Sequence, residues 1–372
     1  MGKHLVIVGA GHAHMTVLKN LRTFVDQGHR VTVISAGAFH YYSGMGPGML
    51  SGIYRPEEIR FHVKKMAEDR GATFLEEKVA TIDPEHKRLQ THSGQTIEYD
   101  VVSFNAGSVV PLPPALSDGA GLVTVKPIEE LLKARQMISE RIHKETLRIT
   151  VVGGGAAGLE MTGNVWRLVH DLQGQATISL IAGSRLLSAF TEKARRLALA
   201  SLQQRQIEVK EGVRLERVEH GMVELSDRTS FESDVVFLAL GVKPSPIFAA
   251  SGLPTGQDGG LLVNAYLQSV AYPEMFGGGD CITFQPRPLE KIGIYAVREN
   301  PILLHNLQAA LNGTPQKTFE PQTAFMLLLN MGDGTAIFIR KSLVWHSKLA
   351  FQLKNYIDTT FMRKFQVSGE RG

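Results

Sequence analysis

A glycine-rich turn in the middle of the chain has the residue spacing of a phosphate-binding site. In "VVGGGAAGLE", Gly153, Gly155 and Gly158 follow an apolar strand and open an amphipathic helix. The first glycine permits a tight turn, the second lets a pyrophosphate approach the backbone, and the third lets the helix pack closely on the strand. Free N–H groups at the helix start then face the phosphates. The pattern predicts a dinucleotide-binding turn, and a glycine turn without a ligand is the alternative.

A second turn, "VGAGHAH", lies near the N-terminus and departs from this pattern. Gly9 and Gly11 keep the first two positions, Ala13 follows, and His14 replaces the third glycine, with His12 two residues before it. We expect at least one imidazole to contact the phosphates of a nucleotide or an adjacent main-chain carbonyl. A ring merely packed between helix and sheet is the alternative for His14. No metal site is expected, because no third ligand is visible nearby.

The acid that normally follows such a turn is missing twice. A carboxylate at the end of the second strand usually binds the adenosine ribose. Ser35 stands there in the first unit and Ala182 in the second. Ser184 and Arg185 follow Ala182 and suit a 2′-phosphate, so NADPH is expected beside NADH. A degenerate second site that binds neither nucleotide is the alternative.

Each of the two glycine turns lies within a predicted βαβ unit, residues 4–35 and 147–182. Each has an apolar strand, a glycine turn, an amphipathic helix and a second strand, and such strands suit a parallel sheet covered on both faces. The expected fold class is therefore α/β, with two Rossmann-like dinucleotide-binding domains and a C-terminal α/β segment. A chain of 372 residues is long enough for two or three domains.

Composition narrows the class of protein further. The net charge is +4 with scattered basic residues, and no nucleic-acid-binding module appears. The single cysteine, Cys281, excludes an intramolecular disulfide. No uncharged apolar run reaches the roughly 18 residues of a membrane-spanning helix. We expect a cytoplasmic protein, with peripheral contact to the inner face of the cell membrane as a further option.

Three other segments carry a family resemblance: "YDVVSFNAGS" (99–108), "DVVFLALGVKP" (234–244) and "EMFGGGDCITF" (274–284). With the N-terminal turn they resemble the FAD domain of the pyridine-nucleotide oxidoreductases, flavoproteins with two dinucleotide-binding domains. The resemblance implies that FAD is the cofactor and that Asp280 hydrogen-bonds the flavin ribityl chain. It also implies that a helix over 292–311 points its positive N-terminus at the flavin ring. The expected FAD-site residues outside the N-terminal turn are Ser35, Pro47, Ala106, Gly107, Gly279, Asp280, Ile292 and Tyr295.

The same resemblance implies a domain arrangement. Residues 1–110 and 240–310 would form the FAD-binding domain, and residues 115–238 an inserted NAD(P)H-binding domain. The proline-rich segment 108–116 would join them. Residues 311–372 would form a C-terminal segment that contacts a membrane or a partner in a homodimer.

Within this family the absence of a cysteine pair excludes the disulfide reductases and argues against typical sulfide:quinone oxidoreductases. The chain resembles the type II NADH dehydrogenases, and most closely the flavoprotein module fused to some bacterial selenophosphate synthetases. It shares with that module the histidine-containing glycine turn, "YSGMGPGMLSG" (42–52), "VKPI" (125–128), "GDC" (279–281) and "YAVR" (295–298). This similarity covers nearly the whole chain.

Hydride transfer requires positioning and electrostatics rather than a nucleophile. The expected residues near the chemistry are Lys126, which would favour negative charge on the flavin, Glu160 near the nicotinamide, and Tyr295 on the acceptor side. A solvated lysine, a glutamate that only favours its helix dipole, and a packed aromatic ring are the alternatives. In the glycine-rich segment 41–52, Pro47 would form a wall beside the flavin ring.

The C-terminal segment shows an apolar stripe with a period of four: Trp345, Leu349, Leu353, Ile357, Phe361 and Phe365. The pattern predicts a helix that wraps or breaks, because a period of four drifts by about 40° per step on an α-helix. The flanking basic residues are Lys348, Lys354, Arg363 and Lys364. A basic amphipathic helix suits a membrane surface, and packing on the flavin domain or on a second copy is the alternative.

The favoured function is an FAD-dependent NAD(P)H dehydrogenase that passes electrons to a quinone-like acceptor. One alternative is a flavoprotein oxidoreductase linked to sulfur or selenium chemistry. The other is a non-catalytic flavin-binding sensor with a vestigial second site, suggested by Ala182.

Overall fold

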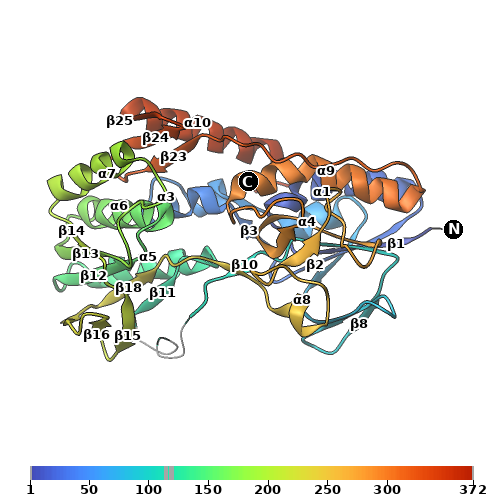
Figure 1. Cartoon of the computed structure of the whole chain (residues 1–372), viewed down its shortest axis with the longest axis horizontal. Helices are drawn as coiled ribbons and strands as arrows, with labels where there is room; N and C mark the ends of the chain where they lie inside the picture. Colours follow the sequence, from blue (N-terminus) through green and yellow to red (C-terminus); the bar gives the residue numbers. More distant parts are fainter. Residues whose placement is uncertain (1, 113–115, 117–120, 371–372) are drawn as a thin grey trace.

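The structure is a computed structural model that describes residues 2–112, 116 and 121–370. Two five-stranded parallel sheets lie side by side along the long axis, and the C-terminal helix α10 (Lys348–Phe365) runs along one side of the molecule (Figure 1). Residues 113–115 of the expected proline-rich crossing, including the expected boundary at 115, lie outside the described residues.

The first sheet contains the N-terminal unit. Its strands in spatial order are β21 (Met275–Gly277), β9 (Val101–Phe104), β1 (His4–Val8), β2 (Arg30–Ser35) and β5 (Thr73–Glu76), all parallel. Its helices are η1 (His12–His14), α1 (Met15–Lys19), α2 (Leu21–Asp26), α4 (Val63–Glu68) and α9 (Gly293–Asn312). Every residue of β1 and β9 is buried, because uninterrupted apolar strands require helices on both faces of the sheet. Strand β21 joins this sheet from far along the chain.

The second sheet repeats the design. Its strands are β11 (Leu122–Thr124), β18 (Val235–Leu238), β12 (Leu147–Val152), β13 (Ala176–Ala182) and β14 (Glu208–Glu211), again all parallel. Its helices are α5 (Glu129–Arg141), α6 (Ala156–Asp171) and α7 (Glu192–Gln204). The expected fold class, α/β with two Rossmann-like units, is confirmed. The domain limits drawn from the sequence stay a prediction.

Smaller elements connect and flank the two sheets. Two antiparallel meanders are β6 (Val79–Asp83), β7 (Arg88–Thr91) and β8 (Thr96–Glu98), and β15 (Leu215–Glu219), β16 (Met222–Leu225) and β17 (Ser230–Glu232). Three short pairs are β3 (His40–Tyr41) with β4 (Arg60–Phe61), β10 (Ser108–Val109) with β19 (Lys243–Pro244), and β20 (Leu261–Val263) with β22 (Ile282–Phe284). The remaining short helices are η2 (Ser43–Met45), α3 (Gly46–Ser51), η3 (Pro56–Glu58), α8 (Ile247–Ala250) and η5 (Gly279–Cys281).

The C-terminal segment is a meander followed by helix α10. The meander strands are β23 (Leu327–Asn330), β24 (Ala336–Arg340) and β25 (Leu343–Ser347). The expectation that Trp345 begins the helical stripe is wrong, because Trp345 lies in β25 and stacks on Phe338 with ring centroids 3.7 Å apart. Ser347 ends the strand and caps α10 by accepting a hydrogen bond from the N–H of Ala350.

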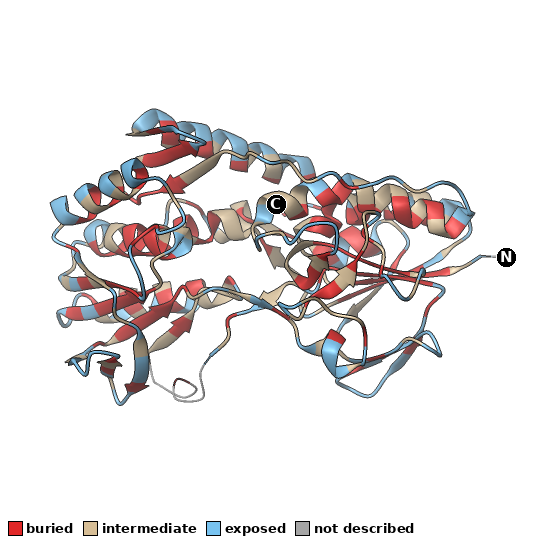
Figure 2. Cartoon of the chain, in the orientation of Figure 1, coloured by how far each residue is buried: buried red, intermediate tan, exposed pale blue. Residues whose placement is uncertain are grey.

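Helix α10 buries a charged pair among apolar residues. Its buried residues are Ala350, Lys354, Asp358, Met362 and Phe365, while Leu349 is 71% exposed and Tyr356 67% exposed. The outward side of the helix is the exposed one in Figure 2. The expectation that Lys354 flanks an apolar contact face from solvent is therefore wrong, because the ion pair with Asp358 lets this charge enter the interior.

Candidate functional site

The N-terminal glycine turn is shaped by a close approach of the loop after β9. Gly9 has a φ of +84°, and a Cβ there would lie 2.3 Å from the carbonyl oxygen of Asn105. A Cβ on Gly11 would lie 2.3 Å from the side-chain Oδ1 of Asn105. That amide accepts the N–H of Ala13 at 3.0 Å and donates to the carbonyl of Gly278 at 2.6 Å. Asn105 thus ties the turn to the Gly279–Asp280 loop, a role that its place in "YDVVSFNAGS" did not reveal.

His14 is a buried structural residue in this turn. Its Nδ1 lies 2.7 Å from the carbonyl oxygen of Gly9, and its Nε2 lies 2.8 Å from the hydroxyl of Ser103. The contact with Gly9 is the main-chain contact that we expected of at least one imidazole. In the second unit a Cβ on Gly158 would lie 1.7 Å from the carbonyl oxygen of Gly153. Because a side chain at this position cannot fit that geometry, the first unit opens as the 3₁₀ turn η1 before α1 begins.

We predict that His14 makes the unfolding free energy depend on pH. Burial lowers the pKa of His14 from 6.5 to about 4. As the pH falls, the unfolded chain therefore takes up the proton first, so this contribution is complete above pH ~6.5 and is lost toward pH ~4. The loss from pH ~7 to pH ~5 should be about 2 kcal/mol for this imidazole.

Urea unfolding of the wild type and His14→Gln at these two pH values measures this loss. The pH-dependent loss should be about 2 kcal/mol smaller in His14→Gln. The matched control His143→Gln, at an exposed position, should behave like the wild type. An equal loss in His14→Gln and wild type would show that His14 does not carry it.

The residues around the first turn fit a dinucleotide with a flavin. Within the described part of the chain, the N–H groups of Gly11 and His12 have no protein acceptor, and they lie at the start of η1. A Cβ on Gly107, or on Gly293 at the start of α9, would meet nothing within 4 Å. Free donors at a helix start and open space beside small residues are what a pyrophosphate and a flat ring require.

Asp280 and Lys126 come together beside this turn. The ammonium of Lys126 donates to Asp280 Oδ2 at 2.7 Å and to the hydroxyl of Ser108 at 3.0 Å, and Ser108 donates to the same Oδ2 at 2.8 Å. Burial alone would raise the pKa of Asp280, but Lys126 and Ser108 outweigh it and hold this pKa below its usual value. Oδ1 accepts no hydrogen bond from the described residues, so it remains able to accept one from a ligand hydroxyl.

Two residues of helix α9 bond the main chain around the site, Glu299 at the Gly279–Asp280 loop and Asn300 at the N-terminal turn. The buried carboxylate of Glu299 accepts the N–H of Gly279 at 2.5 Å, and burial raises the pKa of Glu299 to about 7. Asn300 donates to the carbonyl of His12 at 2.7 Å and accepts the N–H of Thr16 at 2.6 Å. The sequence reasoning missed both, although an acid and an amide inside an apolar helix are a signal of buried polar contacts.

The second glycine turn has the open geometry of a phosphate site. A Cβ on Gly153 would lie 2.2 Å from the carbonyl oxygen of Ala239, whereas one on Gly155 would meet nothing within 4 Å. Within the described residues, the N–H groups of Gly155 and Ala156 at the start of α6 have no protein acceptor. This turn is therefore shaped on one side by the protein and left free on the side that a pyrophosphate would approach.

The expected 2′-phosphate residues lie on the surface beyond β13. Arg185 is exposed and pairs with Glu192 at 2.9 Å, and the hydroxyl of Ser184 contacts that of Ser188. Nearby, Glu211 at the end of β14 accepts the N–H of Leu186 at 2.6 Å. The choice between NADH and NADPH stays a prediction.

A buried ionic cluster links α10 to the glycine-rich segment and to α6. Lys354 donates to Asp358 at 2.8 Å and to the carbonyl of Gly44 at 2.9 Å, and its ammonium lies 4.0 Å from Glu160. Tyr42 donates to the other oxygen of Asp358 at 3.1 Å. Burial raises the pKa of Glu160 despite Lys354 and the N–H of Asn330, which lower it. The sequence singled out Glu160 but gave Lys354 a surface role and omitted Asp358.

Pro47 and Tyr295 take the local positions expected of them. Pro47 lies in the first turn of α3, and the segment it belongs to packs against α5 and α6. Tyr295 lies in the first turn of α9, where its ring contacts Phe325 with centroids 6.0 Å apart. Their roles toward a flavin or an acceptor stay a proposal.

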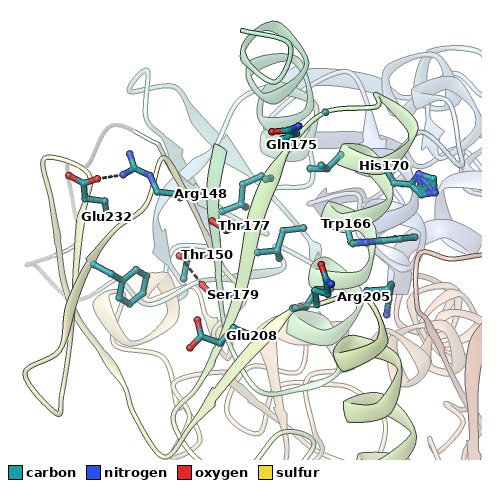
Figure 3. A pocket seen from close by; sticks show the side chains of 18 of the residues that line it. Arg148, Thr150, Trp166, His170, Gln175, Thr177, Ser179, Arg205, Glu208 and Glu232 are labelled. Carbon is teal, nitrogen blue, oxygen red and sulfur yellow. Dashed lines mark hydrogen bonds and ion pairs between the residues drawn. The ribbon is translucent and has the colours of Figure 1, made fainter. Parts of the chain in front are cut away.

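A hollow among the described residues lies elsewhere. It holds about 780 Å³ and opens at the amino ends of β12 and β13, between Trp166 and Arg205 on one side and Arg148 on the other (Figure 3). Arg148 pairs with Glu232, and Ser179 donates to Thr150, so these polar groups satisfy one another. Nucleotides bind at the carboxyl ends of parallel strands, and we therefore assign no ligand to this hollow.

The paired parallel sheets, each with a phosphate-type turn, define a protein built to hold two dinucleotides. The family model described as "Pyridine nucleotide-disulphide oxidoreductase" matches residues 3–305, so the chain belongs to that family. This match and the relatives below confirm the expected recognition as an FAD-dependent pyridine nucleotide oxidoreductase that resembles the type II NADH dehydrogenases. The resemblance to the module fused to selenophosphate synthetases stays a prediction.

Several relatives resemble the whole chain. Ferroptosis suppressor protein 1 of Taeniopygia guttata is 26% identical over 346 residues, covering 89% of this chain and 87% of the relative. A type II NADH:quinone oxidoreductase of Staphylococcus aureus is 24% identical over 402 residues, covering 99% and 96%. Among solved structures, NDH2 of Plasmodium falciparum in complex with NADH superposes with a TM-score of 0.82 at 13% identity, covering 100% and 99%. The sulfide:quinone oxidoreductase of Aquifex aeolicus gives 0.78 at 19%, covering 98% and 92%.

The family name includes disulphide chemistry, but this sequence offers no pair of cysteines for an intramolecular redox disulfide. Cys281 is its single cysteine. The thiol is fully buried, and burial raises its pKa to about 12. Such a thiol is inert as a nucleophile.

Proposed function

We propose that this chain is an NAD(P)H:quinone oxidoreductase that takes hydride from NADH or NADPH onto bound FAD and passes the electrons to a quinone. The observation that carries the proposal is that one family fold contains two phosphate-type turns together with the Lys126–Asp280 pair and the Glu160–Lys354 cluster. The full-length likeness to a type II NADH:quinone oxidoreductase supports it.

Several residues around the first turn would bind FAD. The N–H groups of Gly11 and His12 would hold the FAD pyrophosphate, and Asp280 Oδ1 a ribityl hydroxyl. When bound, FAD would supply the redox chemistry, that is, acceptance of hydride from the nicotinamide and transfer of the electrons to the acceptor. Lys126 pairs with Asp280 beside that site, and the start of α9 adds the positive end of its dipole.

The second turn and the buried cluster serve the two substrates. Gly155 and the start of α6 would hold the pyrophosphate of the nicotinamide nucleotide. Glu160 lies one turn into α6, and Lys354 keeps a buried ammonium 4.0 Å from it. That ammonium would stabilise negative charge on an acceptor bound beside Glu160.

Steady-state turnover of the FAD-loaded protein with a short-chain ubiquinone tests this function. We expect oxidation of NADH or NADPH to depend on the quinone. Quinone-dependent oxidation of sulfide without oxidation of either nucleotide would instead favour the sulfur-linked alternative. Binding of nicotinamide nucleotides without any turnover would favour a sensor.

We further propose that α10 attaches the protein to a membrane surface. None of the described helices is long and apolar enough to cross a bilayer. Leu349, Leu353, Tyr356 and Ile357 recur at helical spacing and are all exposed on α10. Exposed apolar side chains on one helix face, with basic residues in its last turn, suit the interface of an anionic bilayer. The alternative is that this face of α10 contacts a second copy of the chain in a homodimer.

We predict that Leu353→Glu/Ile357→Glu lowers the fraction bound to anionic vesicles by at least about ten-fold, because two charges would have to enter the interface. Vesicle flotation of the full chain measures it. Val270→Glu, at an exposed apolar position outside α10, is the matched control and should float like the wild type. Equal flotation of the wild type, the double variant and the control would contradict the membrane proposal. Sedimentation of the wild type as a dimer would then favour a homodimer contact through α10.

A further inference from the structure

Two half-buried histidines beside the first turn each have a buried ring nitrogen without a partner among the described residues. His12 Nε2 and His40 Nε2 are closed off from solvent and make no hydrogen bond to the described residues. The two rings meet edge to face with centroids 5.3 Å apart. Buried polar atoms are almost always paired in folded proteins, so two unpaired nitrogens in one place indicate a missing ligand.

The surroundings of these nitrogens are aromatic. The ring of His12 lies 5.1 Å from that of Tyr42 and 6.2 Å from that of Phe361, and His40 stacks on Phe61 at 6.4 Å. These rings come from the segment 40–61 and from α10, not from the two nucleotide units. An aromatic enclosure with a few convergent polar atoms is typical of a site for a flat ring.

Other unpaired groups lie in the same segment. Tyr54 Oη and Arg60 Nε are also buried without a partner among the described residues. The ring of Tyr54 packs on Gly48 of α3, where a Cβ would lie 2.6 Å away. Tyr42 connects this region to the Glu160–Lys354 cluster, because its ring contacts His12 and its hydroxyl donates to Asp358.

The charge state of the two imidazoles indicates which kind of ligand they would bind. Burial lowers the pKa of His12 to about 4 and that of His40 to about 3. Both are therefore neutral near pH ~7, and each offers one N–H and one lone pair. A phosphate favours cations and main-chain N–H groups, which Lys126 and the turn itself already provide. Neutral imidazoles suit the carbonyl edge of an uncharged ring.

We infer that His12 and His40 line the acceptor site and donate hydrogen bonds to the carbonyl oxygens of a quinone ring that packs against Tyr42 and Phe361. The inference rests on the proposed function and names the residues that would recognise its acceptor. The test replaces each imidazole by a ring of similar shape that has no N–H, in His12→Phe and His40→Phe. His29→Phe is the matched control, because His29 Nε2 is also unpaired but lies just before the amino end of β2, whereas the glycine turn follows the carboxyl end of the parallel strand β1.

Two constants are measured on each FAD-loaded protein. These are the KM for a short-chain ubiquinone and the Kd for the analogue 2-heptyl-4-hydroxyquinoline N-oxide, the latter from flavin fluorescence without turnover. We expect both to rise by about ten-fold in His12→Phe and His40→Phe, the effect of losing one hydrogen bond to a buried group. They should stay unchanged in His29→Phe. His40→Gln, whose amide restores an N–H, should recover part of the affinity.

Results that would overturn this inference can be distinguished from a result that would contradict only the proposed function. Unchanged KM and Kd in both Phe variants would overturn the inference. Loss of FAD from these variants with unchanged quinone constants would assign the imidazoles to the cofactor and also overturn it. Failure of wild-type quinone turnover would contradict the proposed function alone, because the Kd for the analogue still tests the site.

Discussion

Replacing Lys354 with methionine should lower the free energy of unfolding by about 3–5 kcal/mol, the largest effect expected of any single substitution on α10. The side chain of Lys354 is 9% exposed and neutralises Asp358 at 2.8 Å, with Glu160 at 4.0 Å. Without the ammonium two carboxylates remain buried without a cation. Buried charges that lose their partner are far more costly than exposed ones.

Urea unfolding at pH ~7 measures this effect. Lys348→Met, on the exposed first turn of the same helix, is the matched control and should cost less than about 0.5 kcal/mol. The double variant Lys354→Met/Asp358→Leu should regain much of the loss, because it removes the unpaired carboxylate together with its partner. A cost below about 1 kcal/mol for Lys354→Met would contradict a buried ionic cluster.

Asp280→Ala should weaken FAD binding by about 10- to 100-fold, the effect of one lost hydrogen bond to a charged group. Lys126 and Ser108 both occupy Oδ2, which leaves Oδ1 to accept from the ribityl chain. The substitution also leaves the ammonium of Lys126 without its carboxylate. Fluorescence titration of the FAD-free protein with FAD measures the Kd.

Asp83→Ala is the control for this variant. Asp83 is an exposed carboxylate of the β6–β8 meander that pairs with His86. Its removal should leave the Kd for FAD within two-fold, that is, within about 0.4 kcal/mol. Asp280→Asn, which keeps an acceptor oxygen but not the charge, should lie between the wild type and Asp280→Ala. A Kd within two-fold of wild type for Asp280→Ala would remove Asp280 from the FAD site.

The local patterns of the sequence predicted the two nucleotide turns and their neighbourhood. Gly153, Gly155 and Gly158 each have a steric or open-space reason that depends only on residues close by in the fold. Lys126 and Asp280 were both singled out, and the structure brings them to 2.7 Å. Their contact was not predicted, because it joins elements that only the assembled sheets bring together.

Helix α10 shows why the rest could not be predicted. An apolar stripe normally marks the buried face of a helix, but here Leu349 is exposed and Lys354 is buried. The cause is the ion pair with Asp358 and the carbonyl of Gly44, and no periodicity in the sequence reveals partners of this kind. The roles of Asn105 and Glu299 were not predicted either, because both residues form hydrogen bonds with main-chain groups that are distant in the sequence.

Anaerobic titration of the FAD-loaded protein tests the central claim most directly. Addition of NADH or NADPH should bleach the flavin absorbance at about 450 nm, and a following addition of a short-chain ubiquinone should restore it. Both halves of the reaction are read from one sample without an added dye. No bleaching with either nucleotide, or bleached flavin that the quinone does not reoxidise, would contradict the proposed transfer from NAD(P)H through FAD to a quinone.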